Sequence, residues 1–147
     1  MSFLIQQPAP VPVNRTFPKA PLFRRAAAEL LDRLVPLPFL AHFFWPWAFV
    51  ALAYDLLSDT GGASAGKRLL GLEVRAVRDG ARCSLARSVV RNLPWCLARL
   101  CYTSVAFVPL GLAYDLAEVL LVTFSPTGRR LGDLLAGTQV TPLEALR

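Results

Sequence analysis

Histidine and cysteine are nearly missing from this chain: His42 is the one histidine, and the cysteines are Cys83, Cys96 and Cys101. With a single histidine no zinc-type ligand set can be assembled, and an odd number of cysteines argues against a disulfide framework. Nucleophilic catalysis by a Ser-His-Asp or Cys-His set lacks its parts for the same reason. We therefore expect no enzyme activity, no catalytic residue, no metal site and no cofactor.

Charged residues are also few, at 18% of the 147 residues against roughly 25% of a typical soluble protein. The hydrophobic fraction is 54%, and the mean hydropathy is +0.45. This apolar surplus excludes intrinsic disorder and exceeds what the core of one small domain buries. The net charge is +6, but a nucleic-acid-binding protein would carry its basic residues on a water-soluble fold. The composition predicts a small integral membrane protein whose partner is the lipid bilayer, with no nucleic-acid partner.

The N-terminal segment lacks the apolar stretch of a signal peptide. It contains instead Pro8, Pro10, Pro12, Pro18 and Pro21. Such a proline-rich stretch is typical of an extended or disordered segment. We expect residues 1–21 to form a cytosolic tail, residues 22–141 a membrane domain and residues 142–147 a short C-terminal tail.

Two apolar zones follow, Leu22–Leu57 and Leu93–Phe124. A membrane-spanning helix needs about 20 residues, so each zone is too long for one straight span and short for two. Of the 16 basic residues, 14 lie before, between or after the zones or at the start of the first. Loops rich in lysine and arginine stay in the cytoplasm, so all three basic segments share one side only if each zone is a two-helix hairpin. This predicts a multi-pass protein of the cytoplasmic (inner) membrane with both termini in the cytoplasm.

Prolines mark the expected turns of the two hairpins. Pro36, Pro38 and Pro46 interrupt the first zone near two tryptophans, which are typical of the membrane interface. Pro109 and Gly111 interrupt the second zone, where a proline is also compatible with one long kinked helix. The fold class that we expect is an all-α membrane protein with two short transmembrane hairpins, about four helices in all.

The basic segment between the zones is expected to lie in the cytosol. Alternating residues in 72–77 and the tight-turn dipeptide Asp79-Gly80 predict a small β-hairpin. Ser84 is a candidate N-cap for an amphipathic helix whose apolar stripe comprises Leu85, Ala86, Val89, Val90 and Leu93. The side chains expected to dock anionic lipid headgroups or a partner are Lys67, Arg68, Arg87 and Arg91.

The first apolar zone begins with charges that are costly in a membrane. Arg25, Glu29 and Asp32 lie within about 60° of one another on one helix face, and Glu29 can pair with Arg25 or Arg33 at a spacing of four residues. A charge at membrane depth costs roughly 2.5–3.5 kcal/mol, so such residues face a cavity or the bundle interior and pair. They are candidates either for a ligand or ion path or for an ion pair that holds the helices together.

The second apolar zone repeats this pattern. Asp115 and Glu118 share a helix face, and Arg99 on the preceding helix is their candidate partner. Asp55 and Asp59, near the inner end of the second helix, are expected to meet water. The candidates for the ligand or ion path are therefore Arg25, Glu29, Asp32, Arg99, Asp115 and Glu118.

Four segments of the chain, in a fixed order, together resemble the sequence of a known protein family. They are FRRAAAELLD at residues 23–32, GKRLLGL at 66–72, RNL at 91–93 and SPTGRRLGDLLAGT at 125–138. In this order they resemble the RDD family of small bacterial membrane proteins, over about residues 23–140. The family is named for one arginine and two aspartates, which the resemblance places at Arg25, Asp32 and Asp133. Two departures are Glu29, at a position that is usually apolar in such helices, and a short interval between Asp32 and Gly66.

Two functions stay open, the first implied by the resemblance and the second suggested by the charged residues themselves. One is transport of an unidentified ligand or cation/proton exchange, in which a homo-oligomer surrounds a polar path lined by Arg25, Asp32 and Asp115. The other is a non-transporting scaffold or accessory subunit of a membrane complex, in which buried charges specify helix pairing and the basic loop docks lipid or a membrane-protein partner. In either case we expect Asp133 to pair with an arginine of the first helix or of its own segment.

Overall fold

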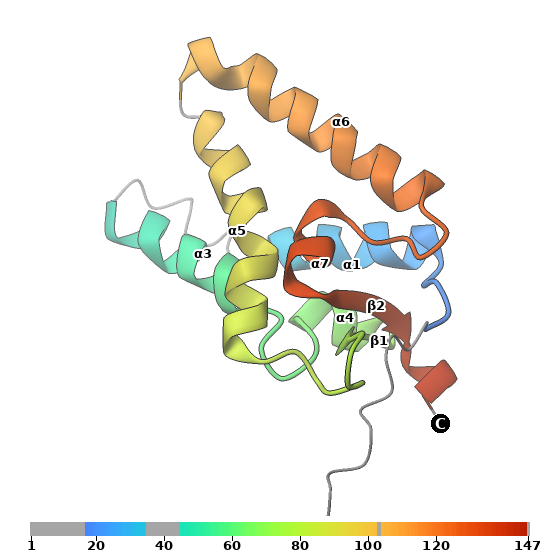
Figure 1. The fold of residues 1–147 in the computed structure, drawn as a ribbon. Helices are drawn as coiled ribbons and strands as arrows, with labels where there is room; N and C mark the ends of the chain where they lie inside the picture. Colours follow the sequence, from blue (N-terminus) through green and yellow to red (C-terminus); the bar gives the residue numbers. More distant parts are fainter. Residues whose placement is uncertain (1–16, 35–44, 103, 147) are drawn as a thin grey trace, which may run out of the picture.

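A computed structural model describes residues 17–34, 45–102 and 104–146 of the chain (Figure 1). The predicted turn of the first zone, with Pro36, Pro38 and His42, lies outside these residues, as does most of the proline-rich tail. The described part is helical apart from one two-stranded sheet. Its elements in chain order are α1 (Leu22–Leu34), α3 (Trp45–Leu57), α4 (Ala65–Leu69), β1 (Leu72–Ala76), α5 (Leu85–Cys101), η1 (Val105–Phe107), α6 (Val108–Phe124), α7 (Leu131–Ala136), β2 (Thr138–Pro142) and η2 (Leu143–Leu146).

Each apolar zone contains two helices in the described residues: α1 and α3 in the first, α5 and α6 in the second. The second zone is therefore not one long kinked helix. Its break lies after Cys101 and not at Pro109, which sits in the first turn of α6, where its missing N–H costs no hydrogen bond. Gly111 lies inside α6, where a Cβ would come within 2.8 Å of the Tyr102 ring.

One stretch of the described residues, Val105–Phe124, is long and apolar enough to cross a membrane by length and composition. Only 11% of its most apolar window is buried, and α6 runs along one edge of the molecule (Figure 1). The number of spans and the sides on which the termini lie stay predictions.

The strand predicted over residues 72–77 forms as β1, but its longer pairing is with a distant strand and not with the other arm of the predicted hairpin. β1 pairs antiparallel with β2, from Leu72 opposite Pro142 to Ala76 opposite Thr138. The segment after the Asp79-Gly80 turn folds back along β1 over a shorter stretch, with one antiparallel bridge between Arg82 and Arg75 and a 2.9 Å hydrogen bond from the N–H of Ala76 to the carbonyl of Ala81. Sequence alternation indicates a strand but carries no information on its partner, which here comes from the far end of the described chain.

The chain segments that flank the helices contact the rest of the fold. Gln139 of β2 donates a 2.7 Å hydrogen bond to the carbonyl of Phe17, and Lys19 donates to the carbonyl of Thr123 at 3.0 Å, near the end of α6. In η2, the N–H of Leu143 donates to the carbonyl of Gly71 at 2.8 Å.

Helix α5 turns its polar side inward. Ser84 caps it by accepting from the N–H of Arg87 at 3.4 Å, as the sequence predicts. The predicted apolar stripe, however, lies largely at the surface, with Leu85 57% exposed, whereas the residues buried along α5 are Ser88, Arg91, Asn92, Cys96 and Ala98. Apolar side chains point outward when lipid is the solvent, and polar ones then pair inside. This inversion agrees with a membrane protein.

Two glycines allow the elements around the core to touch. A Cβ on Gly66 of α4 would lie 2.3 Å from the carbonyl oxygen of Ala28 in α1, and one on Gly132 of α7 would lie 1.8 Å from that of Arg91 in α5. The buried apolar core is small and consists of Ala20, Ala28, Leu72, Val74, Cys83 and Val140. The glycines thus bring α1, α4, α5 and α7 close enough for their charged side chains to meet.

Candidate functional site

Asp133 of α7 is fully buried and lies among arginines from two other helices. Its Oδ1 is 2.8 Å from Nε of Arg91, and its Oδ2 is 3.4 Å from Nη2 of Arg25. The carboxylate also accepts from the N–H of Arg130 at 3.2 Å and from the hydroxyl of Thr138 at 3.3 Å. The structure confirms the prediction that Asp133 pairs with an arginine of the first helix, and it adds a second arginine from α5.

A second buried aspartate completes this group. Asp59 is 0% exposed and lies 2.6 Å from Nζ of Lys67 and 3.4 Å from Nη1 of Arg91. The Arg91 guanidinium therefore bridges the two aspartates. We call the five side chains of Arg25, Asp59, Lys67, Arg91 and Asp133 the inner ion cluster.

The inner ion cluster corrects three sequence predictions. Asp59 does not meet water, and Lys67 and Arg91, at 5% and 1% exposure, do not present their charges to lipid headgroups. The physical reason is that each buried charge needs an opposite charge beside it, and these residues supply one another. Of the other docking candidates, Arg68 is exposed, and Arg87 pairs at 3.4 Å with the exposed Asp79; lipid or partner docking by these two stays a prediction.

The cluster holds its aspartates in the charged form. Burial alone would raise the pKa of Asp59, but Arg91 and Lys67 outweigh it and hold that pKa below its ordinary value. The pKa of Asp133 is likewise lowered, because Arg91, Arg130 and Arg25 together overcome the effect of burial. Both carboxylates therefore stay ionised at neutral pH, although neither contacts water.

These lowered pKa values predict an acid-labile fold. A carboxylate with a depressed pKa in the folded state contributes stability above its unfolded pKa, about 4, and loses it as the pH falls through the folded value. We expect the melting temperature of the protein in detergent to change little from neutral pH down to about pH 5, and to fall steeply below about pH 4. Thermal unfolding followed by circular dichroism across this range measures the effect, and a melting temperature unchanged at about pH 3 would contradict it.

The ion pairs of α1 reach across to other elements and not along the helix. Glu29 pairs with Arg130 at 3.0 Å, and not with Arg25 or Arg33 as predicted from spacing. The guanidinium of Arg33 lies 4.9 Å over the ring of Trp95. An ion pair within one exposed helix stabilises it by only about 0.2–0.5 kcal/mol. Glu29 and Arg25 therefore pair with residues of the elements packed against α1.

Asp32 of α1 forms hydrogen bonds with the start of α4. It accepts from the hydroxyl of Ser64 at 2.5 Å and from the N–H of Gly66 at 2.7 Å, at the start of α4. This is a packed contact between two helices, made possible by the missing side chain of Gly66. Asp32 also lines a small pocket of about 50 Å³, together with Glu29 and Asp55.

The carboxylates of α6 have tyrosines beside them. Asp115 accepts from the hydroxyl of Tyr102 at 2.6 Å, and Glu118 accepts from the hydroxyl of Tyr114 at 2.9 Å and from the N–H of Leu131 at 3.0 Å. The predicted partner, Arg99, pairs instead with Asp55 of α3. The reason is packing: α5 lies against α3 on the side from which Arg99 projects.

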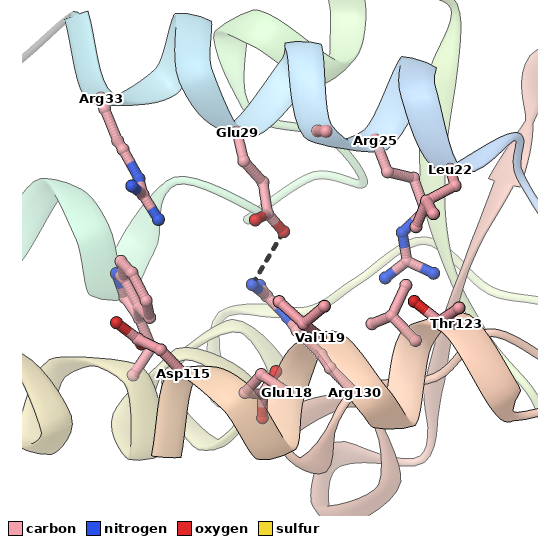
Figure 2. A pocket seen from close by; sticks show the side chains of 12 residues that line it. Leu22, Arg25, Glu29, Arg33, Asp115, Glu118, Val119, Thr123 and Arg130 are labelled. Atoms are coloured by element: carbon pink, nitrogen blue, oxygen red, sulfur yellow. Dashed lines mark hydrogen bonds and ion pairs between the residues drawn. The ribbon is translucent and has the colours of Figure 1, made fainter. Parts of the chain in front are cut away.

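A pocket of about 350 Å³ lies between α1 and α6, and we call it the α1–α6 pocket (Figure 2). Its apolar lining includes Leu22, Ala26, Trp95, Val119 and Val122, and its charged lining is Arg25, Glu29, Arg33, Asp115, Glu118 and Arg130. Four of the six side chains predicted for a ligand or ion path thus meet here: Arg25, Glu29, Asp115 and Glu118. Asp32 lies in the neighbouring small pocket, and Arg99 lines neither.

Sequence reasoning did not single out Arg130 or the interior role of Arg91. Asp133 accepts from the N–H of Arg130 at the start of α7, which is half of a capping box; the other half needs a serine or threonine in place of Arg130, so the sequence lacked the usual signal. For Arg91 the signal was the stripe of Ser88, Asn92 and Cys96, small or polar residues at helical spacing beside the more apolar one. In the described residues, no group of three or more histidine, cysteine or acidic side chains is placed to hold a metal ion.

Comparison with known proteins yields one match. The model of the RDD family matches residues 37–137, more than half of the chain. The matched segment includes Asp59, Lys67, Arg91 and Asp133, whereas Arg25 and Asp32 precede it. Searches of curated proteins and of solved structures found no match.

Proposed function

The chain belongs to the RDD family of membrane-associated proteins, and from this premise we propose that it takes part in transport, binding a small ligand in the α1–α6 pocket and exchanging it for a proton. The observation that carries the proposal is the pocket itself. It has a volume of about 350 Å³ and lies beside the stretch that is apolar enough to cross a membrane. A cavity that combines apolar walls with a few charged groups is the usual form of a small-molecule site.

The acidic groups of α6 suit an exchange of protons. Asp115 and Glu118 accept hydrogen bonds from tyrosine hydroxyls, and neither forms a salt bridge within the part of the chain that the structure describes. A carboxylate held by direct contacts with several cations resists protonation more strongly than one whose direct contacts are neutral donors. The aspartates of the inner ion cluster lack this freedom, because cations hold them ionised.

A flux measurement tests the proposal. We expect proteoliposomes with an acidic interior and a pH-sensitive dye to release protons when Na⁺, K⁺ or phenethylammonium is added outside, above the rate of protein-free vesicles. The Glu118→Gln variant is expected to lose most of this release, about tenfold or more, since it cannot carry the proton. The matched control is Asp79→Asn, which changes an exposed carboxylate at a turn and is expected to leave the rate unchanged. Equal rates in wild type and Glu118→Gln, or no protein-dependent release, would refute the transport role.

A second candidate function is favoured by the inner ion cluster. Each of its charges has an opposite charge within 3.4 Å, so each charged side chain of the cluster is already in an ion pair. This is the arrangement expected of a scaffold or accessory subunit whose buried charges fix helix pairing. Absence of flux, together with a membrane protein that co-purifies in a fixed ratio, would favour this function over transport.

A further inference from the structure

We propose that the ligand of the α1–α6 pocket is an organic ammonium ion that carries an apolar group. This inference rests on the proposed transport function and narrows it to one class of ligand. It depends on three features of the pocket: two carboxylates that form no salt bridge, a buried oxygen without a hydrogen-bond partner, and apolar walls.

The carboxylates of Asp115 and Glu118 form no salt bridge in the described residues, although both line the pocket. Two of the three arginines in the lining have salt-bridge partners: Arg130 pairs with Glu29, and Arg25 pairs with Asp133, which it shares with Arg91. A cation bound beside the two α6 carboxylates gains a direct attraction that an anion lacks.

The positions of these groups leave room for the cation. Figure 2 shows Arg33 facing the Asp115 end of the pocket, with Glu118 farther along α6. The guanidinium of Arg33 is stacked 4.9 Å over Trp95, which shows that the aromatic wall on this side already receives a cation. Glu118 accepts from Tyr114 and from the N–H of Leu131, so its direct contacts are neutral donors, and the nearby Arg130 is paired with Glu29.

Asp115 presents a buried oxygen that lacks a donor. Its Oδ2 accepts from the Tyr102 hydroxyl at 2.6 Å, whereas its Oδ1 is buried without a hydrogen-bond partner in the described residues. Buried carboxylate oxygens are nearly always hydrogen-bonded, because an unmade bond is costly. An ammonium N–H in the pocket would supply the missing donor together with the missing charge.

The walls of the pocket require that the ion have an apolar part. The lining between the charged groups consists of Leu22, Ala26, Val119, Val122 and the Trp95 ring. A bare metal cation prefers a small cage of several oxygens, and no cluster of three or more ligating side chains occurs in the described residues. A volume of about 350 Å³ fits a small organic molecule better than a single ion.

Binding of matched probes tests the proposal. We would titrate the purified full-length protein in detergent at neutral pH with phenethylammonium, with its uncharged isostere propylbenzene, and with the anion phenylacetate. The expected result is saturable binding of phenethylammonium alone. The double variant Asp115→Asn, Glu118→Gln is expected to weaken it at least tenfold, and Asp79→Asn to leave it unchanged.

A second variant tests the pocket without removing a charge, in case the double variant fails to fold. Ala26→Phe leaves every charge in place but fills the pocket from its exposed rim, and it is expected to weaken phenethylammonium binding to a similar degree. Equal affinity for propylbenzene would overturn the proposal and indicate an apolar site such as one for a lipid chain. Binding unaffected by both variants, or no binding of phenethylammonium by wild type, would also overturn it. The transport role is judged separately, by the proton flux.

Discussion

Replacing Asp133 by alanine is expected to destabilise the fold by about 3–5 kcal/mol, enough to unfold a marginally stable protein. The side chain is 0% exposed, and its removal leaves the guanidinium groups of Arg25 and Arg91 buried with less than their counter-charge. A buried cation without an acidic partner has lost its hydration, and no ion pair compensates for that loss. Thermal unfolding in detergent, together with the yield of monodisperse protein in size-exclusion chromatography, measures the effect.

The chain offers a matched control for this variant, because the neighbouring arginine of α1 also has an acidic partner. Arg24, next to Arg25, pairs with Glu144 at 2.9 Å, and the two side chains are 43% and 74% exposed. Glu144→Ala removes the partner of an α1 arginine at the surface, where such a pair is worth about 0–1 kcal/mol. If Asp133→Ala melted within a degree or so of Glu144→Ala, the inner ion cluster would not be a source of stability.

Gly132→Ala is expected to be almost as damaging, although it adds a single methyl group. Its Cβ would lie 1.8 Å from the carbonyl oxygen of Arg91, so α7 must move away from α5. Overpacking typically costs about 1–3 kcal/mol, and here the movement also pulls the neighbouring Asp133 from its arginines. We expect a loss on the order of 3 kcal/mol, read as a lower melting temperature in detergent.

Gly137→Ala separates crowding from backbone strain. Gly137 has φ +62°, and a Cβ there would meet nothing within 4 Å. The cost is then that of the left-handed conformation alone, about 1–2 kcal/mol. If Gly137→Ala destabilised the protein more than Gly132→Ala, the close contact between α7 and α5 would not be important for the stability of the fold.

Much of the helix pattern was predictable from sequence because it depends on local properties. Ser84 begins α5 because a serine can accept from the backbone three residues on, and the polar residues Tyr102 and Ser104 lie where the second apolar zone divides into α5 and α6. The pairing of Asp133 with Arg25 was predictable only through the resemblance to the RDD family. No local rule connects residues that are 108 positions apart.

The partners of the charged residues could not be predicted, because they depend on how the helices pack. Spacing along α1 suggested Arg25 for Glu29, but Arg130 reaches it from the segment before α7. Positive charge between the zones suggested lipid contact for Lys67, but Asp59 lies 2.6 Å away inside the fold. In both cases the residue type indicated that a partner exists, and only the three-dimensional arrangement identified it.

The order in which the chain is synthesised gives the arginines two successive roles. Asp133 and β2 follow α6 in the sequence, so they leave the ribosome after all the long helices have been made. Until then Arg25 lacks its aspartate, and Arg91 has only Asp59, which it shares with Lys67. In the topology predicted from the sequence, the surplus positive charge of this interval favours placing these residues on the cytoplasmic side of the membrane. Once Asp133 has been made, the same charges become part of the interior of the folded protein.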